Sequence, residues 1–342
     1  MRRKLFIHVG AGKTGTSALQ DFFFANEERL AQKGVVFPKH GRSPNKISIA
    51  HHPLAWRGRF RLGEEADVLA LWREIAALEQ PRLVVSSEFF HGKVTDPDGP
   101  AFFEKLKEMF HDTDIRIVFY LRRQSQWLQS AYAQWVKNNL QSRTFQKFVR
   151  SFAHNPVDQV FAYAEVFGSE AMIVRPFERG QFAGGSIQRD FCAAIGINWD
   201  DAFVLPEGNP NPRFAGDALE LKRQINRFAG TARELRAIQR DLQAYSDLVG
   251  RDSRSVFVSH AMLDRTEQQR IENENEPKYA RIARDFLGRA DGVLFRDPLP
   301  QAPETAEADE GAVATDQVRV YLLMQIHHRI ERLRRKLKTK TP

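Results

Sequence analysis

Short apolar runs alternate with helical periodicity in the N-terminal part of the chain. The apolar runs predict strands over 4–9, 34–38, 82–86, 115–121 and 171–174, because a few apolar residues bounded by glycine or polar residues are typical of a buried strand. Apolar positions three and four apart predict helices over 16–32, 67–78, 100–110, 124–137 and 187–194. This alternation predicts a three-layer α/β fold, in which helices cover both faces of a mainly parallel sheet.

Beyond about residue 213 the pattern predicts helices only, over 214–229, 231–247 and 264–288. Residues 300–312 combine proline, alanine and acidic residues and predict a linker. Residues 313–342 predict a basic amphipathic helix. We therefore expect one domain over 1–299, with an α/β core over about 4–200 and a helical part over about 213–290, followed by the linker and the C-terminal helix.

Composition narrows the class of protein. The chain has 342 residues and one cysteine, Cys192, which excludes a disulfide within the chain and a cysteine-based zinc site. The net charge is +8, and residues 329–342 contribute +6 of it, so the charge does not indicate a general nucleic-acid binder. Apolar runs are too short to span a bilayer or to form a secretory signal, and we expect a cytoplasmic protein.

A glycine-rich segment, VGAGKTGTSAL, lies where the first strand should meet the first helix. Backbone N–H groups of such a turn can converge on an anion, the helix N-terminus adds partial positive charge, and Lys13 adds a full charge. A Walker A loop needs a glycine five residues before Gly12, where Ile7 stands, so this loop is shorter. The segment predicts a phosphate-binding turn, and the alternative is a plain strand-to-helix turn.

A second candidate anion site follows the predicted strand 115–121. Arg122 and Arg123 come directly after that strand. Ser130 lies eight residues after Arg122, in the second turn of the next predicted helix. A guanidinium binds phosphate oxygens as a fork, and a hydroxyl adds a neutral donor. Ligands of open parallel sheets bind at the carboxyl ends of the strands, where both glycine loop and arginines fall.

These segments resemble a known enzyme family. HVGAGKTGTSALQ resembles the 5′-phosphosulfate loop of sulfotransferases that use 3′-phosphoadenylyl sulfate (PAPS), and VFYLRRQSQWLQSAYAQ resembles their 3′-phosphate motif. VVSSEFF and MIVRPFERGQFAGGSIQRDFCAAIGI are similar to segments of bacterial members, so the resemblance covers roughly 4–230. It implies a P-loop-related α/β fold and PAPS as the sulfuryl donor.

Carried over residue by residue, the resemblance implies two sets of cofactor contacts. The 5′ side of PAPS would be held by Gly12, Lys13, Thr14, Gly15, Thr16 and Ser17. Arg122 and Ser130 would hold the 3′-phosphate. The family often has Asp-Pro after the arginine, where this chain has Arg123-Gln124, which leaves open which arginine binds.

The implied reaction is transfer of a sulfuryl group to a hydroxyl, or an amine, of a carbohydrate or glycolipid. Lys13 would stabilise charge on the leaving phosphate, and an acceptor hydroxyl needs a general base. Glu88, just after the predicted strand 82–86, and His52, in the loop ISIAHHPLAW, are the two candidates, and neighbouring His51 is a substitute for His52. We expect no metal, because no acidic cluster with ligand spacing accompanies the glycine loop.

Weaker signals concern the acceptor and the partners. Arg57, with His51 beside Trp56, suits a sugar or an anionic glycan, and Asn209 and Arg213 suit acceptor contacts. Loop polarity explains these residues equally well. The C-terminal helix fits peripheral membrane contact, a partner helix or packing on its own domain. The sequence leaves open whether the chain forms a homo-oligomer.

Two other functions fit the same fold. A P-loop kinase would bind ATP with magnesium. The short glycine loop and the lack of a metal-holding aspartate beside it argue against a kinase. A non-catalytic protein would use the fold to hold a nucleotide or a glycan, against which Lys13 argues.

Overall fold

The protein is described by a computed structural model. Within it the structure describes residues 2–43, 49–56, 64–151, 155–206, 214, 216–228, 232–251, 262–300, 302, 318–319, 321–326 and 329. Arg57, Asn209 and Arg213 and most of the predicted linker lie outside the described residues.

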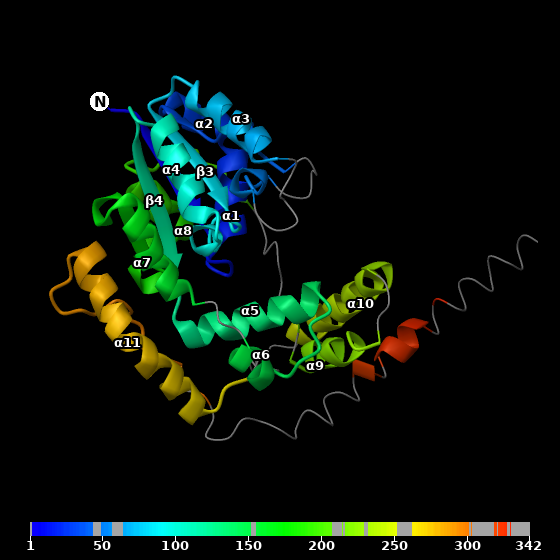
Figure 1. The fold of residues 1–342 in the computed structure, drawn as a ribbon. Helices are drawn as coiled ribbons and strands as arrows, with labels where there is room; N and C mark the ends of the chain where they lie inside the picture. Colours follow the sequence, from blue (N-terminus) through cyan, green and yellow to red (C-terminus); the bar gives the residue numbers. More distant parts are fainter. Residues whose placement is uncertain are drawn as a thin grey trace, which may run out of the picture. The chain divides into compact units, whose positions relative to one another are not determined.

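The strands form a five-stranded parallel sheet (Figure 1). Its strand order is β2-β3-β1-β4-β5, with β1 (Lys4–Val9), β2 (Val35–Val36), β3 (Arg82–Ser87), β4 (Asp114–Leu121) and β5 (Met172–Pro176). β1 is therefore central, and the chain crosses from one side of it to the other between β3 and β4. Because the strands are parallel, the segments after β1, β3, β4 and β5 all leave the sheet at one edge.

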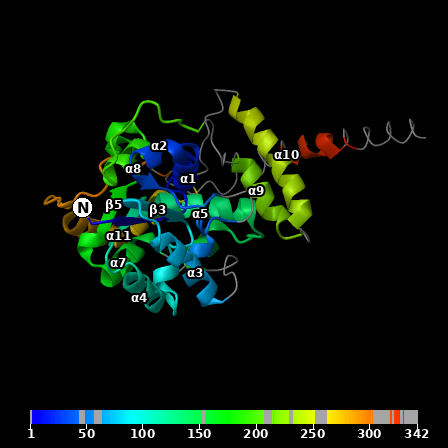
Figure 2. The same cartoon turned by 90° about the horizontal axis from the view of Figure 1, so that it is seen from above.

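Helices cover both faces of the sheet, as predicted (Figure 2). Alternate side chains of β1 divide between two cores: Ile7 packs with one and Phe6 with the other. The Ile7 side is covered by α3 (Glu65–Ala76), α4 (Gly99–Met109), α7 (Pro156–Phe167) and residues of α11 (Arg265–Leu287). The Phe6 side is covered by α1 (Thr16–Ala25), α8 (Ile187–Ala194) and Leu30 of α2 (Glu27–Gln32).

The predicted helix over 16–32 is two helices, with a break at Asn26. The Asn26 amide donates to the carbonyl oxygens of Phe22 and Val204, both at 2.8 Å, and its oxygen accepts from the N–H of Val204. Gly15 is the N-cap of α1, so the helix begins at Thr16. Gly15 adopts a left-handed backbone conformation, which glycine tolerates better than other residues.

The helices α6 (Phe145–Ser151) and α7 lie in a stretch for which the sequence pattern gave no prediction. α7 is nevertheless well marked locally. Pro156 occupies its first turn, and the Asn155 side chain accepts from the N–H of Val157 at 3.0 Å. α7 packs its Val160 and Tyr163 into the Ile7 side of the core. Short 3₁₀ turns occur at Pro53–Ala55, Lys93–Thr95, Ser169–Ala171, Arg179–Gln181 and Ala183–Gly185.

The chain forms two compact units. The first, which holds the sheet, comprises residues 1–124, 154–210 and 272–299. The second comprises residues 125–153, 211–271 and 300–342, and contains α6, α9 (Gly216–Ile225), α10 (Ala232–Arg251) and all of α5 (Gln124–Asn138) but its first residue. Its core gathers Trp127 and Val136 of α5, Phe148, Leu242 and Val318. Among the described helices none is long and apolar enough to cross a membrane.

Candidate anion-binding site at the carboxyl edge of the sheet

The loop between β1 and α1 has a left-handed backbone at several positions. Gly12, Lys13 and Gly15 have φ of 58°, 62° and 75°. A side-chain-bearing residue such as Lys13 rarely adopts this conformation, and functional loops are where such strain persists. A left-handed residue beside a right-handed one turns successive backbone N–H groups toward one point, which is the geometry of an anion nest.

Two threonine hydroxyls of this loop are buried without a partner. The side chains of Thr14 and Thr16 are 0% and 2% exposed, and no described residue hydrogen-bonds to either Oγ1 atom. Leaving a buried hydroxyl unsatisfied costs about 1–3 kcal/mol. No side chain caps the N-terminus of α1 in the described structure, and its first turn holds no acidic residue. The loop therefore presents donors that an anionic ligand would satisfy.

Side chains from other elements enclose the loop. A Cβ at Gly10 would lie 2.5 Å from Thr16 Oγ1 and 3.2 Å from Glu88 Cγ. A Cβ at Gly15 would lie 2.6 Å from Ile187 Cδ1 and 3.3 Å from the Phe177 ring. Both glycines are required by close approach. Glu88 follows β3, and Ile187 begins α8, so separate chain segments meet at the glycine loop.

Both candidate bases lie at the end of β3. Val9, the last residue of β1, is in register with Ser87, the last residue of β3, so Glu88 stands level with the start of the loop. Glu88 is half-buried. His52 is 7% exposed, and its Nδ1 lies 2.8 Å from Ser87 Oγ. The structure thus brings the end of β3, and with it both candidates, beside β1.

His51 makes its described hydrogen bonds to backbone groups outside the glycine loop. Its Nε2 donates to the Pro38 carbonyl at 2.8 Å, and its Nδ1 accepts from the N–H of Ser86 at 3.2 Å. Burial lowers the pKa of His51 to about 3, so the ring is neutral. These contacts occupy both ring nitrogens, and a role of His51 at the acceptor stays a prediction.

The two arginines after β4 have different surroundings. The Arg122 guanidinium lies over the Phe177 ring at 5.9 Å, and that ring is the one against Gly15. Arg123 forms an ion pair with Glu178 at 3.6 Å and donates to the Asp297 carbonyl at 2.6 Å. Arg122 is therefore the arginine that a chain of contacts connects to the loop.

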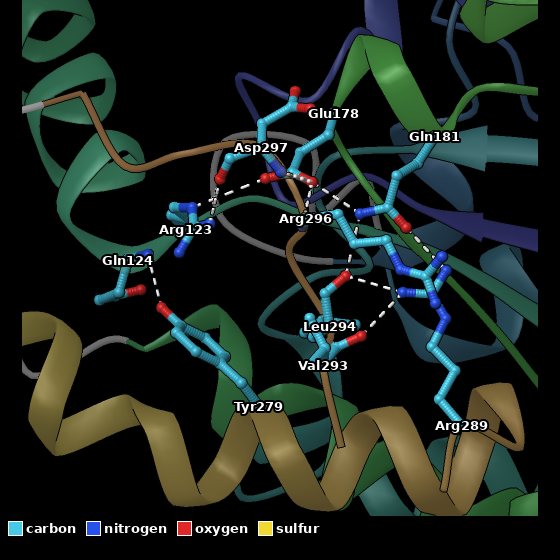
Figure 3. A network of polar contacts seen from close by, with 10 residues as sticks. All are labelled: Arg123, Gln124, Glu178, Gln181, Tyr279, Arg289, Val293, Leu294, Arg296 and Asp297. Atoms are coloured by element: carbon cyan, nitrogen blue, oxygen red, sulfur yellow. Dashed lines mark hydrogen bonds and ion pairs between the residues drawn. The ribbon is translucent and has the colours of Figure 1, made fainter. Parts of the chain in front are cut away.

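A polar network fastens Arg123 to the segment after α11 (Figure 3). The buried Glu178 Oε2 accepts from the N–H groups of Arg296 at 2.8 Å and Asp297 at 3.2 Å, and from Gln181 Nε2 at 2.6 Å. Because Glu178 also pairs with Arg123, the network ties the Arg123 side chain to the segment after α11.

Two further residues, Arg289 and Tyr279, belong to this network. The Arg289 guanidinium donates to the carbonyl oxygens of Val293 at 3.0 Å and Leu294 at 2.9 Å. The hydroxyl of Tyr279 accepts from the N–H of Gln124 at 2.8 Å, at the first residue of α5. Sequence reasoning missed this network, because its members are scattered over more than one hundred residues.

A buried carboxylate anchors α8 to the sheet. Asp190 is fully buried and accepts from the Tyr120 hydroxyl at 2.7 Å, from Arg175 Nε at 3.0 Å and from the N–H of Ala183 at 2.8 Å. Burial and the adjacent carboxylate raise the pKa of Tyr120, so the hydroxyl stays a donor. This anchor fixes Ile187 against the loop, a second feature that the sequence did not reveal.

The remaining predicted residues divide into three groups. Ser17 is exposed in the first turn of α1. Ser130 lies on α5 in the second unit, and its contact with a 3′-phosphate stays a prediction. Arg57, Asn209 and Arg213 lie outside the described residues. Among the residues that the structure describes, no group of three or more His, Cys, Asp or Glu side chains is placed to hold a metal ion.

Comparisons with known proteins give limited matches. No family model matches the chain. The chain is 33% identical over 109 residues to an uncharacterized protein of Archaeoglobus fulgidus, a match that covers 31% of this chain and only 30% of that protein. Among solved structures it is similar to a sulfotransferase from Alicyclobacillus acidocaldarius, with 18% identity and a TM-score of 0.39, over 66% of this chain and 94% of that chain.

Proposed function

We propose that the protein is a sulfotransferase that moves a sulfuryl group from PAPS to a hydroxyl, or an amine, of a carbohydrate or glycolipid. The observation that carries the proposal is the pair of buried, unpartnered threonine hydroxyls on a left-handed loop that leads into α1. The sequence motifs that resemble the PAPS-binding motifs of sulfotransferases supply the identity of the anion.

In this proposal, residues of the glycine loop and Arg122 bind the charged groups of PAPS. Thr14 and Thr16 would donate their hydroxyls to oxygens of the 5′-phosphosulfate, together with backbone N–H groups of Gly12 and Gly15 and the exposed Ser17. Arg122 would bind the 3′-phosphate. Bound PAPS would supply an activated sulfuryl group, whose transfer releases adenosine 3′,5′-bisphosphate (PAP).

The chain's own residues would then assist an in-line transfer. Lys13 neutralises negative charge that builds on the bridging oxygen as the sulfur–oxygen bond breaks. Glu88 accepts the proton of the acceptor hydroxyl as its oxygen bonds to sulfur. We favour Glu88 over His52 because Glu88 Cγ approaches Gly10 at the loop entry, whereas His52 contacts Ser87 Oγ and packs edge-on against the Phe89 ring.

Transfer of radiolabelled sulfate tests this function. The purified chain is incubated with labelled PAPS and a panel of glycans and glycolipids with free hydroxyl groups, and labelled products are separated by chromatography. The proposal predicts labelled acceptor with wild type and a loss of about two to four orders of magnitude in rate with Glu88→Gln. Phosphate transfer from ATP with magnesium to the same panel, without sulfate transfer, would favour a kinase instead. Tight PAP binding without transfer to any acceptor would favour a non-catalytic protein.

A further inference from the structure

The C-terminal helix packs one face on its own unit. Its described residues are helical at 318–319, 321–326 and 329. Val318 is fully buried in the core of the second unit, and the Tyr321 ring lies 5.3 Å from that of Tyr245 on α10. Arg329 forms an ion pair with Asp241, also on α10. The predicted packing on the chain's own domain therefore accounts for one face of this helix.

The opposite side of the same helix carries three exposed apolar side chains among its described residues. Leu323, Met324 and Ile326 are 64%, 54% and 51% exposed. Leu323 and Ile326 are three residues apart and so share a face of the helix. Since the packed face is already occupied by α10, this outward apolar side needs another explanation. We call Leu323, Met324 and Ile326 the outer apolar face.

The positive charge of the chain after the outer apolar face indicates what kind of surface would cover that face. The chain from residue 329 onward holds seven basic residues and one acidic residue, Glu331; the basic residues are Arg329, Arg332, Arg334, Arg335, Lys336, Lys338 and Lys340. In a pair of copies joined through this helix, two such tails would repel each other. An anionic lipid surface attracts them, with about 1 kcal/mol per basic residue near the surface. A nucleic acid would match the charge and leave the apolar residues uncovered.

We propose that the outer apolar face docks on the surface of a bilayer that contains anionic phospholipids. Leu323, Met324 and Ile326 enter the boundary between headgroups and acyl chains, and the basic residues after Arg329 contact lipid phosphates. The attachment is peripheral and reversible, because one short helix buries little apolar area. This attachment would bring the chain to a surface where glycolipids are found. The proposal does not depend on the sulfotransferase assignment.

Vesicle cosedimentation of the full chain tests the proposal. Vesicles of phosphatidylcholine alone are compared with vesicles of phosphatidylcholine mixed with phosphatidylglycerol, at low and high salt. We expect binding to the mixed vesicles only, with binding weakened by salt. The double variant Leu323→Asn, Ile326→Asn should bind the mixed vesicles at least about tenfold more weakly than wild type. Neutralising three charges, with Lys336→Gln, Lys338→Gln and Lys340→Gln, should weaken binding about a hundredfold.

A matched control separates docking from general apolar exposure. Leu248 of α10 is 58% exposed in the same unit, and Leu248→Asn should bind vesicles like wild type. Melting temperatures of all variants establish that the fold is intact. Equal binding to both vesicle types, or unchanged binding by the double variant, overturns the proposal. The proposal is also overturned if wild type does not bind vesicles and forms a dimer in sedimentation velocity, while the double variant is a monomer. The outer apolar face would then be covered by a second copy of the chain.

Discussion

At the scale of single residues, the glycine loop keeps two hydroxyls buried and without partners. Thr14 and Thr16 are covered by the fold, yet nothing described in the chain accepts their protons. A fold tolerates such a cost where a ligand repays it on binding, and the adjacent left-handed Lys13 is a second unfavourable feature in the same place. The site is thus marked by local instability in the unliganded chain.

Thr16→Val removes one hydroxyl and keeps the shape of the side chain. We expect the affinity for PAP to fall about tenfold to a hundredfold, since a hydrogen bond to a charged group is lost. The melting temperature of the ligand-free chain should stay level or rise, because an unsatisfied buried group is gone. Calorimetric titration and thermal unfolding measure the two effects.

Thr113→Val is the matched control for that substitution. Thr113 is 5% exposed, and its hydroxyl accepts from Arg3 and donates to Asp112. Its loss should lower stability by about 1 kcal/mol and leave PAP affinity unchanged. If Thr16→Val behaves like Thr113→Val in both measurements, the Thr16 hydroxyl serves the fold and not a ligand.

Glu88→Gln and His52→Ala separate the candidate bases. Glu88→Gln should lower kcat by about two to four orders of magnitude and leave PAP affinity near that of wild type, because a base acts on the acceptor. His52→Ala should lower kcat less. Steady-state transfer rates and PAP titrations are measured in parallel, and normal turnover by both variants would show that neither residue is the base.

Arg122→Gln and Arg123→Gln test which arginine binds the 3′-phosphate. The Arg122 variant should lose about tenfold to a hundredfold in affinity for PAP and little for adenosine 5′-phosphate, which lacks that group. The Arg123 variant should instead lower the melting temperature, since the buried carboxylate of Glu178 would lose its ion-pair partner. Calorimetry with both nucleotides and thermal unfolding give the answer, and the opposite pattern would reassign the site to Arg123.

At the scale of elements, local pattern predicted most strands and helices, and distant contacts decided the rest. The strand Lys4–Val9 and the helix Ile187–Ala194 have the bounds that the sequence predicted. The break at Asn26 was missed because its partner, Val204, lies far along the chain. The glycine loop was predictable because its donors are neighbours in sequence. The walls formed by Phe177 and Ile187 were not, because only the parallel register brings them to Gly15.

A buried lysine couples α9 to the last turn of α5. Lys222 is fully buried, and its Nζ donates to the Val136 carbonyl at 3.2 Å. Burial lowers the pKa of Lys222 from 10.5 to about 8. Between these pH values the unfolded lysine is protonated and the folded one is neutral, so raising pH favours the folded state.

The stability of wild type relative to Lys222→Met should therefore increase as pH rises from about 8 toward 10.5. Urea unfolding of both proteins across this range gives the difference in the free energy of unfolding, in which other titrating groups cancel. A difference that stays flat with pH would mean that folded Lys222 keeps its ordinary pKa.

At the scale of the whole molecule, chemistry and charge occupy different parts of the chain. The loop, the end of β3 and Arg122 belong to the unit that holds the sheet, whereas most of the net charge lies after Arg329. The sequence predicted this separation from charge alone. It gave no sign that α9, α10 and Val318 share a core with α5 and α6, because helical periodicity identifies a buried face and not its partner.

Calorimetric titration of the full chain with PAP, ATP, and ATP with magnesium tests the central claim most directly. The account predicts binding of PAP that weakens with Thr16→Val and Arg122→Gln, and much weaker binding of ATP with or without magnesium. A chain that ignores PAP and binds the triphosphate tightly would contradict it.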